Sequence, residues 1–150
     1  MRKGIGGHHR PHDGNSHEWF TPPEILKALG PFDDDPCRPG IHDGLDRKWR
    51  GFVWLNPPYG PHVGTWLARL ADHGKGIAIV FARTETRWFF ETVWDRADAL
   101  LFLRGRLHFY RNGQRAKYNA GGPSVLIGYG EQAVWRLRSA VLDGKLVLIL

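Results

Sequence analysis

The chain has 150 residues, the size of one domain, with 42% apolar and 24% charged residues, as in ordinary globular proteins. Its formal net charge of +6 favours a polyanionic partner such as nucleic acid. The single cysteine, Cys37, excludes an intrachain disulfide and a multi-cysteine metal site. Because no apolar run approaches the roughly 18 residues of a membrane span, we expect a cytoplasmic protein without a membrane partner.

The N-terminal residues 1–17 are rich in Gly, His and Arg and offer almost nothing to bury. This composition predicts a mobile basic tail, followed by one folded domain over residues 18–150. Four of the eight histidines lie in the tail and offer a possible metal site, but a solvated tail is the favoured interpretation.

The first predicted helix follows Thr21-Pro22-Pro23-Glu24, because Thr21 and Glu24 have capping-box spacing and a proline occupies the first helical position. This helix is expected to run to Leu29 and to end at Gly30. Further elements follow in order: a short strand at 32–35, a buried strand at 52–55, a helix at 63–72, a buried strand at 76–82 and an amphipathic helix at 84–94.

The second half continues with a strand at 97–103, and then the pattern changes. Residues 106–110 and 124–129, with the Asn112-Gly113 turn signal between them, predict a hairpin-like excursion. A helix at 131–139 and a last strand at 145–150 complete the series. Strands that alternate with helices of about ten residues predict an α/β domain whose sheet is mostly parallel, with an antiparallel closing piece.

The stretch Asn56-Pro57-Pro58-Tyr59 follows the buried strand at 52–55. In open α/β sheets, ligands bind beyond the carboxyl ends of the strands. The two prolines fix successive φ angles and remove N–H donors, so the Asn56 side-chain oxygen and the Pro57 carbonyl remain as acceptors. Two acceptors on a stiff turn suit an amino group, and Tyr59 could stack on the ring that carries it. The alternative is a rigid turn with Tyr59 packed on the core.

Five motifs in one order extend this observation over residues 18–130. They are Glu18-Trp19-Phe20-Thr21-Pro22-Pro23, Asp33-Asp34-Asp35-Pro36-Cys37, Trp54-Leu55-Asn56-Pro57-Pro58-Tyr59-Gly60, Ala82-Arg83-Thr84-Glu85-Thr86-Arg87-Trp88-Phe89 and Arg104-Gly105-Arg106-Leu107-His108-Phe109. Together they closely resemble the small phage-encoded DNA N6-adenine methyltransferases of the Dam-like family. The resemblance implies a Rossmann-like fold and methyl transfer from S-adenosylmethionine to adenine N6 in DNA, inside the bacterial host cell.

The resemblance also implies roles for the motif residues. Asn56 and Pro57 would accept the two N6 hydrogens of a flipped-out adenine, on the turn completed by Pro58, while Tyr59 holds one face of the base. Such acceptors strengthen as positive charge develops on the nitrogen, and no metal is required. The residues implied for the cofactor are Phe20, Thr21, Pro22, Asp33, Asp35, Pro36 and Asp43.

The chain departs from most methyltransferases because Asp35-Pro36-Cys37-Arg38-Pro39-Gly40 stands where a Gly-rich loop is usual. The acidic residue for the cofactor ribose is also unclear, with Asp43 the nearest option. A surface turn or a metal site are the other interpretations of residues 33–35.

The expected DNA contacts lie around the Asn112-Gly113 turn, where basic and aromatic residues alternate, and at the end of the strand at 76–82. The candidates are Phe109, Arg83, Arg87, Arg104, Arg106, Arg111, Arg115 and Lys117. A buried strand position for Phe109 and a solvated basic hairpin are the alternatives.

Two other functions stay open. The first is an amino-methyltransferase that acts on RNA or protein, although those enzymes usually keep the Gly-rich loop. The second is a degenerate methyltransferase fold that only binds DNA as an accessory protein. The sequence leaves the recognition site and the oligomeric state unspecified.

Overall fold

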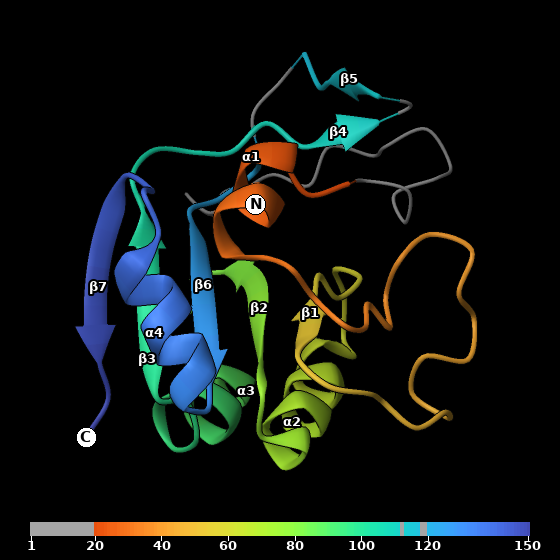
Figure 1. Cartoon of the computed structure of the whole chain (residues 1–150), viewed down its shortest axis with the longest axis vertical. Coiled ribbons are helices and arrows are strands. Elements are labelled where there is room, and N and C mark those ends of the chain that lie inside the picture. The colour runs from red at the N-terminus through yellow and green to blue at the C-terminus, as the bar shows by residue number, and fades with distance from the viewer. Residues whose placement is uncertain (1–19, 112, 118–119) are drawn as a thin grey trace, which may run out of the picture.

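The computed structural model describes residues 20–111, 113–117 and 120–150, so the predicted tail at 1–17 lies outside the described residues. Within them, five strands form a central sheet in the order β1-β2-β6-β3-β7, and a separate hairpin consists of β4 and β5 (Figure 1). The strands are β1 (Val53–Leu55), β2 (Gly76–Phe81), β3 (Ala99–Leu103), β4 (Tyr110–Arg111), β5 (Gln114–Arg115), β6 (Ser124–Tyr129) and β7 (Gly144–Leu148). The helices are α1 (Pro23–Leu29), α2 (Val63–His73), α3 (Arg87–Phe89), the π-helix η1 (Phe90–Trp94) and α4 (Glu131–Ser139).

The α/β class is confirmed, but the prediction of a mostly parallel sheet is wrong. Only β1 and β2 pair in parallel, whereas β2–β6, β3–β6 and β3–β7 are antiparallel. The reason is the position of β6, which returns from the excursion into the middle of the sheet. One reversed strand between β2 and β3 replaces a parallel pairing with two antiparallel ones. Since β2 and β3 both oppose β6, they run in the same direction as each other and as β1.

Both faces of the sheet are buried, which explains the continuous apolar runs of β2 and β6. Alternate strand residues point to opposite faces. Val53 and Val80 pack with Leu67 of α2 and Val93 of η1 in one cluster. The opposite cluster joins strand residues such as Ile79 to α1 and α4. The sheet therefore lies between α1 and α4 on one face and α2, α3 and η1 on the other (Figure 1).

The predicted helices are found with two changes at their starts. The N-cap of α1 is Pro22, without a side-chain cap, so the capping box expected from Thr21 and Glu24 does not form. The helix expected at 84–94 begins only at Arg87, where Thr86 accepts the N–H of Phe89, and it continues as the π-helix η1. No helix in the described part of the chain is long and apolar enough to cross a membrane.

The strands differ from expectation mainly around the excursion. Residues 106–110 and 124–129 do not pair with each other, because β4 pairs with β5 across the turn and β6 joins the central sheet. The short strand expected at 32–35 is reduced to one parallel bridge between Asp34 and Val53. This bridge still places the acidic turn, residues 33–35, along the outer side of β1.

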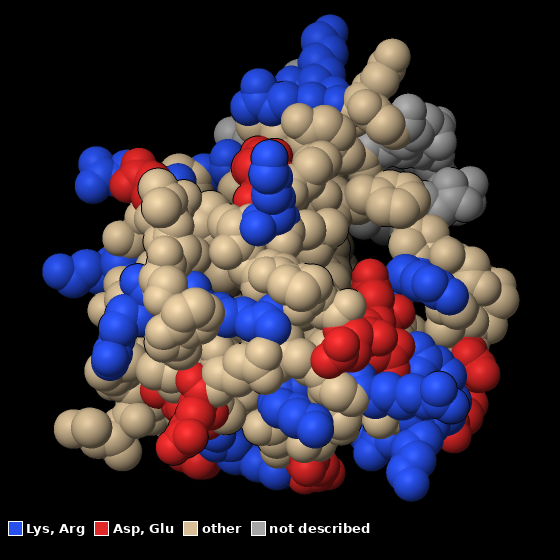
Figure 2. Space-filling model, in the orientation of Figure 1, with Lys and Arg blue, Asp and Glu red and all other residues tan. Residues whose placement is uncertain are grey.

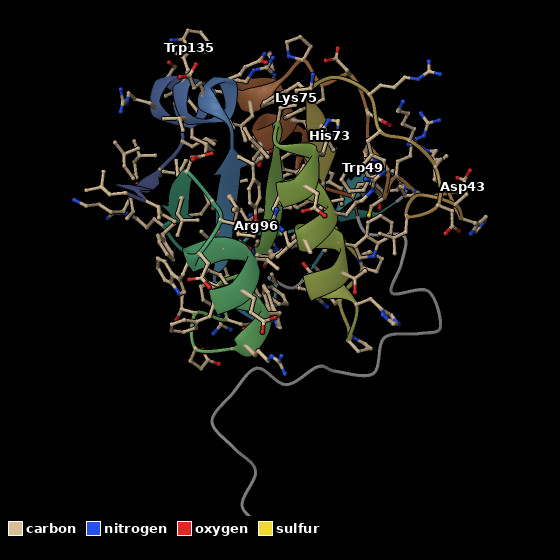
Figure 3. The ribbon with its side chains drawn as sticks, turned by 90° about the horizontal axis from the view of Figure 1, so that it is seen from below. Asp43, Trp49, His73, Lys75, Arg96 and Trp135 are labelled. Atoms are coloured by element: carbon tan, nitrogen blue, oxygen red, sulfur yellow. The ribbon has the colours of Figure 1, made fainter. Side chains whose placement is uncertain are left out.

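Residues 36–50 form no helix or strand, and Trp49 fixes this segment against α2. The Trp49 indole donates to the carbonyl of Gly44 at 2.6 Å and stacks on Trp66 with ring centroids 6.3 Å apart. The guanidinium of Arg69 lies 5.2 Å from the centre of the Trp49 ring. Figure 3 shows Trp49 beside His73 of α2, while Asp43 points away from the domain at the outer edge of the segment.

Candidate active site at the carboxyl ends of β1 and β2

A narrow cavity of about 80 Å³ lies where Asn56 follows β1. All four residues of the 56–59 turn line it, together with the predicted site residues Phe20, Thr21, Asp35 and Phe109. The structure thus brings together residues that are up to 89 positions apart in the sequence, from Phe20 to Phe109. The position agrees with ligand binding beyond the carboxyl ends of strands.

Thr21 holds the side chain of Asn56. The Nδ2 atom of Asn56 donates to Oγ1 of Thr21 at 3.1 Å, and Thr21 is only 6% exposed. Oδ1 of Asn56 has no hydrogen-bond donor among the described residues. The turn therefore keeps an acceptor oxygen available, as the sequence predicted, but the partner of its amide nitrogen was missed.

Tyr59 is part of an aromatic stack. Its ring lies 4.6 Å from that of Phe81, at an angle of 4°, and Phe109 contacts it edge-on at 6.5 Å. The guanidinium of Arg83 lies 5.5 Å from the centre of the Phe81 ring. One face of Tyr59 is thus covered by Phe81, so a base could stack only on its other face. Phe109 is 7% exposed, which agrees with the alternative of a buried residue as well as with a cavity wall.

A wide cavity of about 860 Å³ adjoins the narrow one. All three carboxyl groups of the acidic turn line it, and so do the basic residues Arg38, Arg47, Lys48 and Arg50. Leu26, Asp35, Arg38 and Trp54 line both cavities. The two cavities therefore share a wall, with Asp35 at their junction.

The three carboxylates of the acidic turn differ in their contacts. Asp33 accepts the N–H of Phe52 at 2.7 Å. Asp34 binds Arg47 through both oxygens, at 2.8 and 2.7 Å, and this hydrogen-bonded pair lowers its pKa. Asp35 forms no ion pair within the described residues, and burial raises its pKa to about 6. Asp35 is therefore the carboxylate of this turn most available to a cationic ligand.

The other predicted cofactor residues do not reach the cavities. Pro22 and Pro36 are buried and line neither cavity, and Pro22 is the N-cap of α1. Asp43 also lines neither cavity and is exposed. The described residues contain no group of three or more His, Cys, Asp or Glu side chains that could hold a metal ion.

The predicted DNA-contact residues differ in their surroundings. Arg106, Arg115 and Lys117 are exposed on and beside the β4–β5 hairpin, where Figure 2 shows basic side chains at the top of the molecule. Two other candidates form exposed ion pairs, Arg87 with Glu91 at 2.7 Å and Arg104 with Asp143 at 3.1 Å. Arg111 pairs with Gln114 through the hairpin register.

The hairpin is connected to the narrow cavity through the backbone. Phe20 and Tyr110 exchange two hydrogen bonds, of 2.8 and 2.9 Å. The residue before Thr21 is thus tied to β4, and the exposed basic side chains of the hairpin lie next to the site.

Sequence reasoning missed Phe81, Arg38 and Trp54 as site residues. Phe81 is the last residue of β2, the parallel neighbour of β1. Because the carboxyl ends of the two strands lie at the same edge, the expected strands could have placed Phe81 beside the 56–59 turn. Arg38 and Trp54 lie within segments singled out in the sequence but were given no role, because each reaches the cavities only through the packing of residues 33–38 against β1.

Comparison with protein-family models, curated proteins and solved structures finds no match to this chain. The assignment of function consequently depends on the residues of the site.

Proposed function

We propose that this chain transfers a methyl group from S-adenosylmethionine to the N6 amino group of adenine in DNA, on a Rossmann-like fold. The observation that carries the proposal is the arrangement at Asn56. A proline-locked turn offers an amide oxygen that has no donor among the described residues in a narrow cavity, and a wide cavity that could hold a cofactor shares its wall.

The direction of the strands supports the Rossmann-like part of the proposal. β1, β2 and β3 run the same way, and the bridge at Asp34 adds a further parallel segment beside β1. Asp35 and Asn56 follow neighbouring parallel segments, so both side chains lie at the edge where such folds bind ligands.

Asn56 and Pro57 would act as acceptors for the two hydrogens of an amino group. Pro57 and Pro58 have no N–H, so the turn presents oxygen atoms without competing backbone donors. The amino nitrogen would gain the methyl group as the bond from that methyl to the cofactor sulfur breaks, and it would stay positively charged until it releases one proton to solvent. While it is charged, its hydrogens bind acceptors more strongly. Asn56 and Pro57 therefore stabilise the transition state more than the ground state.

The wide cavity fits the cofactor in size and chemistry. Its volume of about 860 Å³ lies within the range of about 300–1,000 Å³ typical of small-molecule sites. Asp35 offers a carboxylate to an ammonium or sulfonium group, while Arg38 and Lys48 offer cations to a carboxylate. Bound S-adenosylmethionine supplies an activated methyl group, and these residues would hold and orient it.

The narrow cavity must open to admit a base. An apolar cavity of about 150 Å³ holds one benzene molecule, whereas this one measures about 80 Å³ and adenine is larger than benzene. Phe20 and Tyr59 line the cavity and are exposed, at 46% and 37%. Their displacement would enlarge it and would expose the free face of Tyr59 for stacking.

The test is incubation of the protein with S-adenosylmethionine and adenine-containing DNA, followed by nucleoside mass spectrometry. N6-methyladenine is the expected product. Parallel reactions with RNA and with protein test the other amino-methyltransferase activities. Absence of methylation in all three reactions would exclude the proposed enzyme.

A DNA-binding accessory protein is the second candidate, and the small volume of the narrow cavity favours it. Calorimetric titration with S-adenosylmethionine distinguishes the two. A methyltransferase binds the cofactor and releases or absorbs heat, whereas the accessory protein shows only heat of dilution.

A further inference from the structure

The hydrogen bond to Thr21 goes with one orientation of the Asn56 amide, in which Nδ2 lies toward Thr21. An amide carries a donor nitrogen and an acceptor oxygen on one carbon atom, pointing in different directions. Nδ2 donates to Thr21 at 3.1 Å, and rotation of the amide by half a turn would exchange this bond for one in which the Thr21 hydroxyl donates to Oδ1. Both residues line the cavity, so the two orientations present opposite hydrogen-bonding groups to a ligand.

We infer that Thr21 is a positioning residue that selects a ligand bearing an amino group over one bearing a carbonyl. The inference rests on the proposed function, since it concerns the base that the same cavity would take. With Oδ1 toward the cavity, Asn56 accepts from the amino group of adenine. A base with a carbonyl at that position places two acceptors against each other and leaves both unpaired.

The surroundings of Thr21 suit a positioning role. Thr21 is nearly buried and does not cap α1, so no helix end competes for its hydroxyl oxygen. Its backbone is fixed on both sides, by the paired hydrogen bonds between Phe20 and Tyr110 and by Pro22 at the start of α1. A rigid backbone keeps Oγ1 in place, which a selective contact requires.

The experiment measures affinity for single-stranded oligonucleotides that carry either adenine or hypoxanthine at one central position. The two bases differ in an amino group and a carbonyl at the same ring carbon. The wild-type protein should bind the adenine oligonucleotide more tightly. Thr21→Val keeps the side-chain shape but removes the acceptor, and it should lower this preference about tenfold, the effect of roughly one hydrogen bond with an unpaired partner.

Thr21→Ser retains the hydroxyl and should keep the preference. Melting temperatures of both variants establish that any loss is not due to unfolding. A Thr21→Val protein with the wild-type preference would overturn the inference. A wild-type preference for hypoxanthine would also overturn it, because Thr21 would then donate to Oδ1 and leave Nδ2 toward the base.

Asn56→Asp provides a background in which orientation cannot matter, since both carboxylate oxygens are acceptors. Adding Thr21→Val to Asn56→Asp should therefore change the base preference by less than twofold. A cofactor-binding role for Thr21 would instead weaken the binding of S-adenosylmethionine in both backgrounds. Calorimetric titration should show unchanged cofactor affinity, and a tenfold loss would contradict the positioning role.

These measurements separate the inference from the proposed function because base preference is read without turnover. Selective binding of adenine without methylation contradicts the enzyme but supports the role of Thr21. Methylation with equal preference in the wild type and in Thr21→Val contradicts the role of Thr21 but supports the enzyme. A wild-type protein with no preference for either base contradicts the inference directly.

Discussion

The 56–59 turn and the acidic turn at residues 33–35 follow neighbouring parallel segments at one end of the sheet, yet they use their polar groups differently. In the 56–59 turn, proline geometry replaces hydrogen bonds, and the oxygen of Asn56 stays available. In the acidic turn, Asp33 accepts a backbone N–H and Asp34 binds Arg47, whereas Asp35 has no ion pair within the described residues. A cluster of charges can thus be mainly structural, while a single amide oxygen stays available to a ligand.

The largest expected effect is on turnover and comes from Asn56→Ala. Loss of an oxygen that stabilises developing charge typically lowers kcat by about 10²–10³-fold. Stability should fall by only about 1 kcal/mol, since one hydrogen bond to Thr21 is lost. Rates of N6-methyladenine formation and thermal melting measure the two quantities.

The matched control is Gln132→Ala, which removes an exposed amide from α4. It should leave turnover at the wild-type rate. If Asn56→Ala also kept wild-type turnover, the catalytic role of the 56–59 turn would be wrong.

The second effect is on stability and comes from Asp34→Ala. This change leaves Arg47 and the N–H of Arg50 without their partly buried acceptor, which should lower the free energy of unfolding by about 2–4 kcal/mol. Denaturant titration measures the change. Asp43→Ala, at the exposed edge of the segment 36–50, should alter stability by less than about 0.5 kcal/mol. If Asp34→Ala and Asp43→Ala lowered the free energy of unfolding equally, Asp34 would not be the structural carboxylate that its contacts indicate.

The third prediction concerns Asp35, whose pKa burial raises to about 6 from the ordinary value of 3.8. The folded state then holds a proton that the unfolded state has released, so this group's contribution to stability falls as pH rises between about 4 and 6. Asp35→Asn should therefore raise the free energy of unfolding at pH 7.5 by about 1–3 kcal/mol, which raises the melting temperature. At pH 3.5 the substitution should change the melting temperature little.

The same group should control cofactor affinity. Ionised Asp35 attracts a cationic ligand, so the affinity of the wild type for S-adenosylmethionine should fall as pH drops below about 6. The Asp35→Asn variant should bind more weakly and lose this dependence. Calorimetric titration at several pH values measures it, and an unchanged pH profile in the variant would assign the cofactor to other residues.

The smallest effect is on DNA affinity at the hairpin. Arg106→Gln and Arg115→Gln should each reduce the slope of log K against log salt concentration by about 0.9, as for one lost phosphate contact. Arg104→Gln should have a smaller effect, because Arg104 is already paired with Asp143. Fluorescence anisotropy over a range of salt concentrations measures the slopes. If all three variants had the same slope as the wild type, the hairpin would not bind phosphate.

Local patterns predicted most elements because each depends on its own residues. The helix at 131–139 and the strands β1 and β2 were found close to their expected bounds, since apolar periodicity and burial coincide there. The arrangement of the sheet was not predictable in this way. Whether β6 lies at an edge or between β2 and β3 depends on contacts across the chain, which its own residues do not specify.

The candidate site shows the same division. The stiffness of the 56–59 turn follows from its own prolines, which the sequence shows directly. The partners of Thr21 and Tyr59 come from distant segments, and no local rule links Thr21 to Asn56 or Tyr59 to Phe81. The capping box failed because the N-cap of α1 is Pro22, and the hydroxyl of Thr21 instead binds a residue 35 positions away.

The place of β6 has a consequence for the order in which the protein can fold during synthesis. β2 and β3 are made first, but β2 pairs mainly with β6, and β3 pairs with β6 and β7, all of which leave the ribosome later. Until residues 124–129 emerge, both earlier strands present open hydrogen-bonding edges that can bind other chains. Nascent chains that stall before this point should therefore depend on chaperones, and the domain gains its cooperativity only when its central strand arrives.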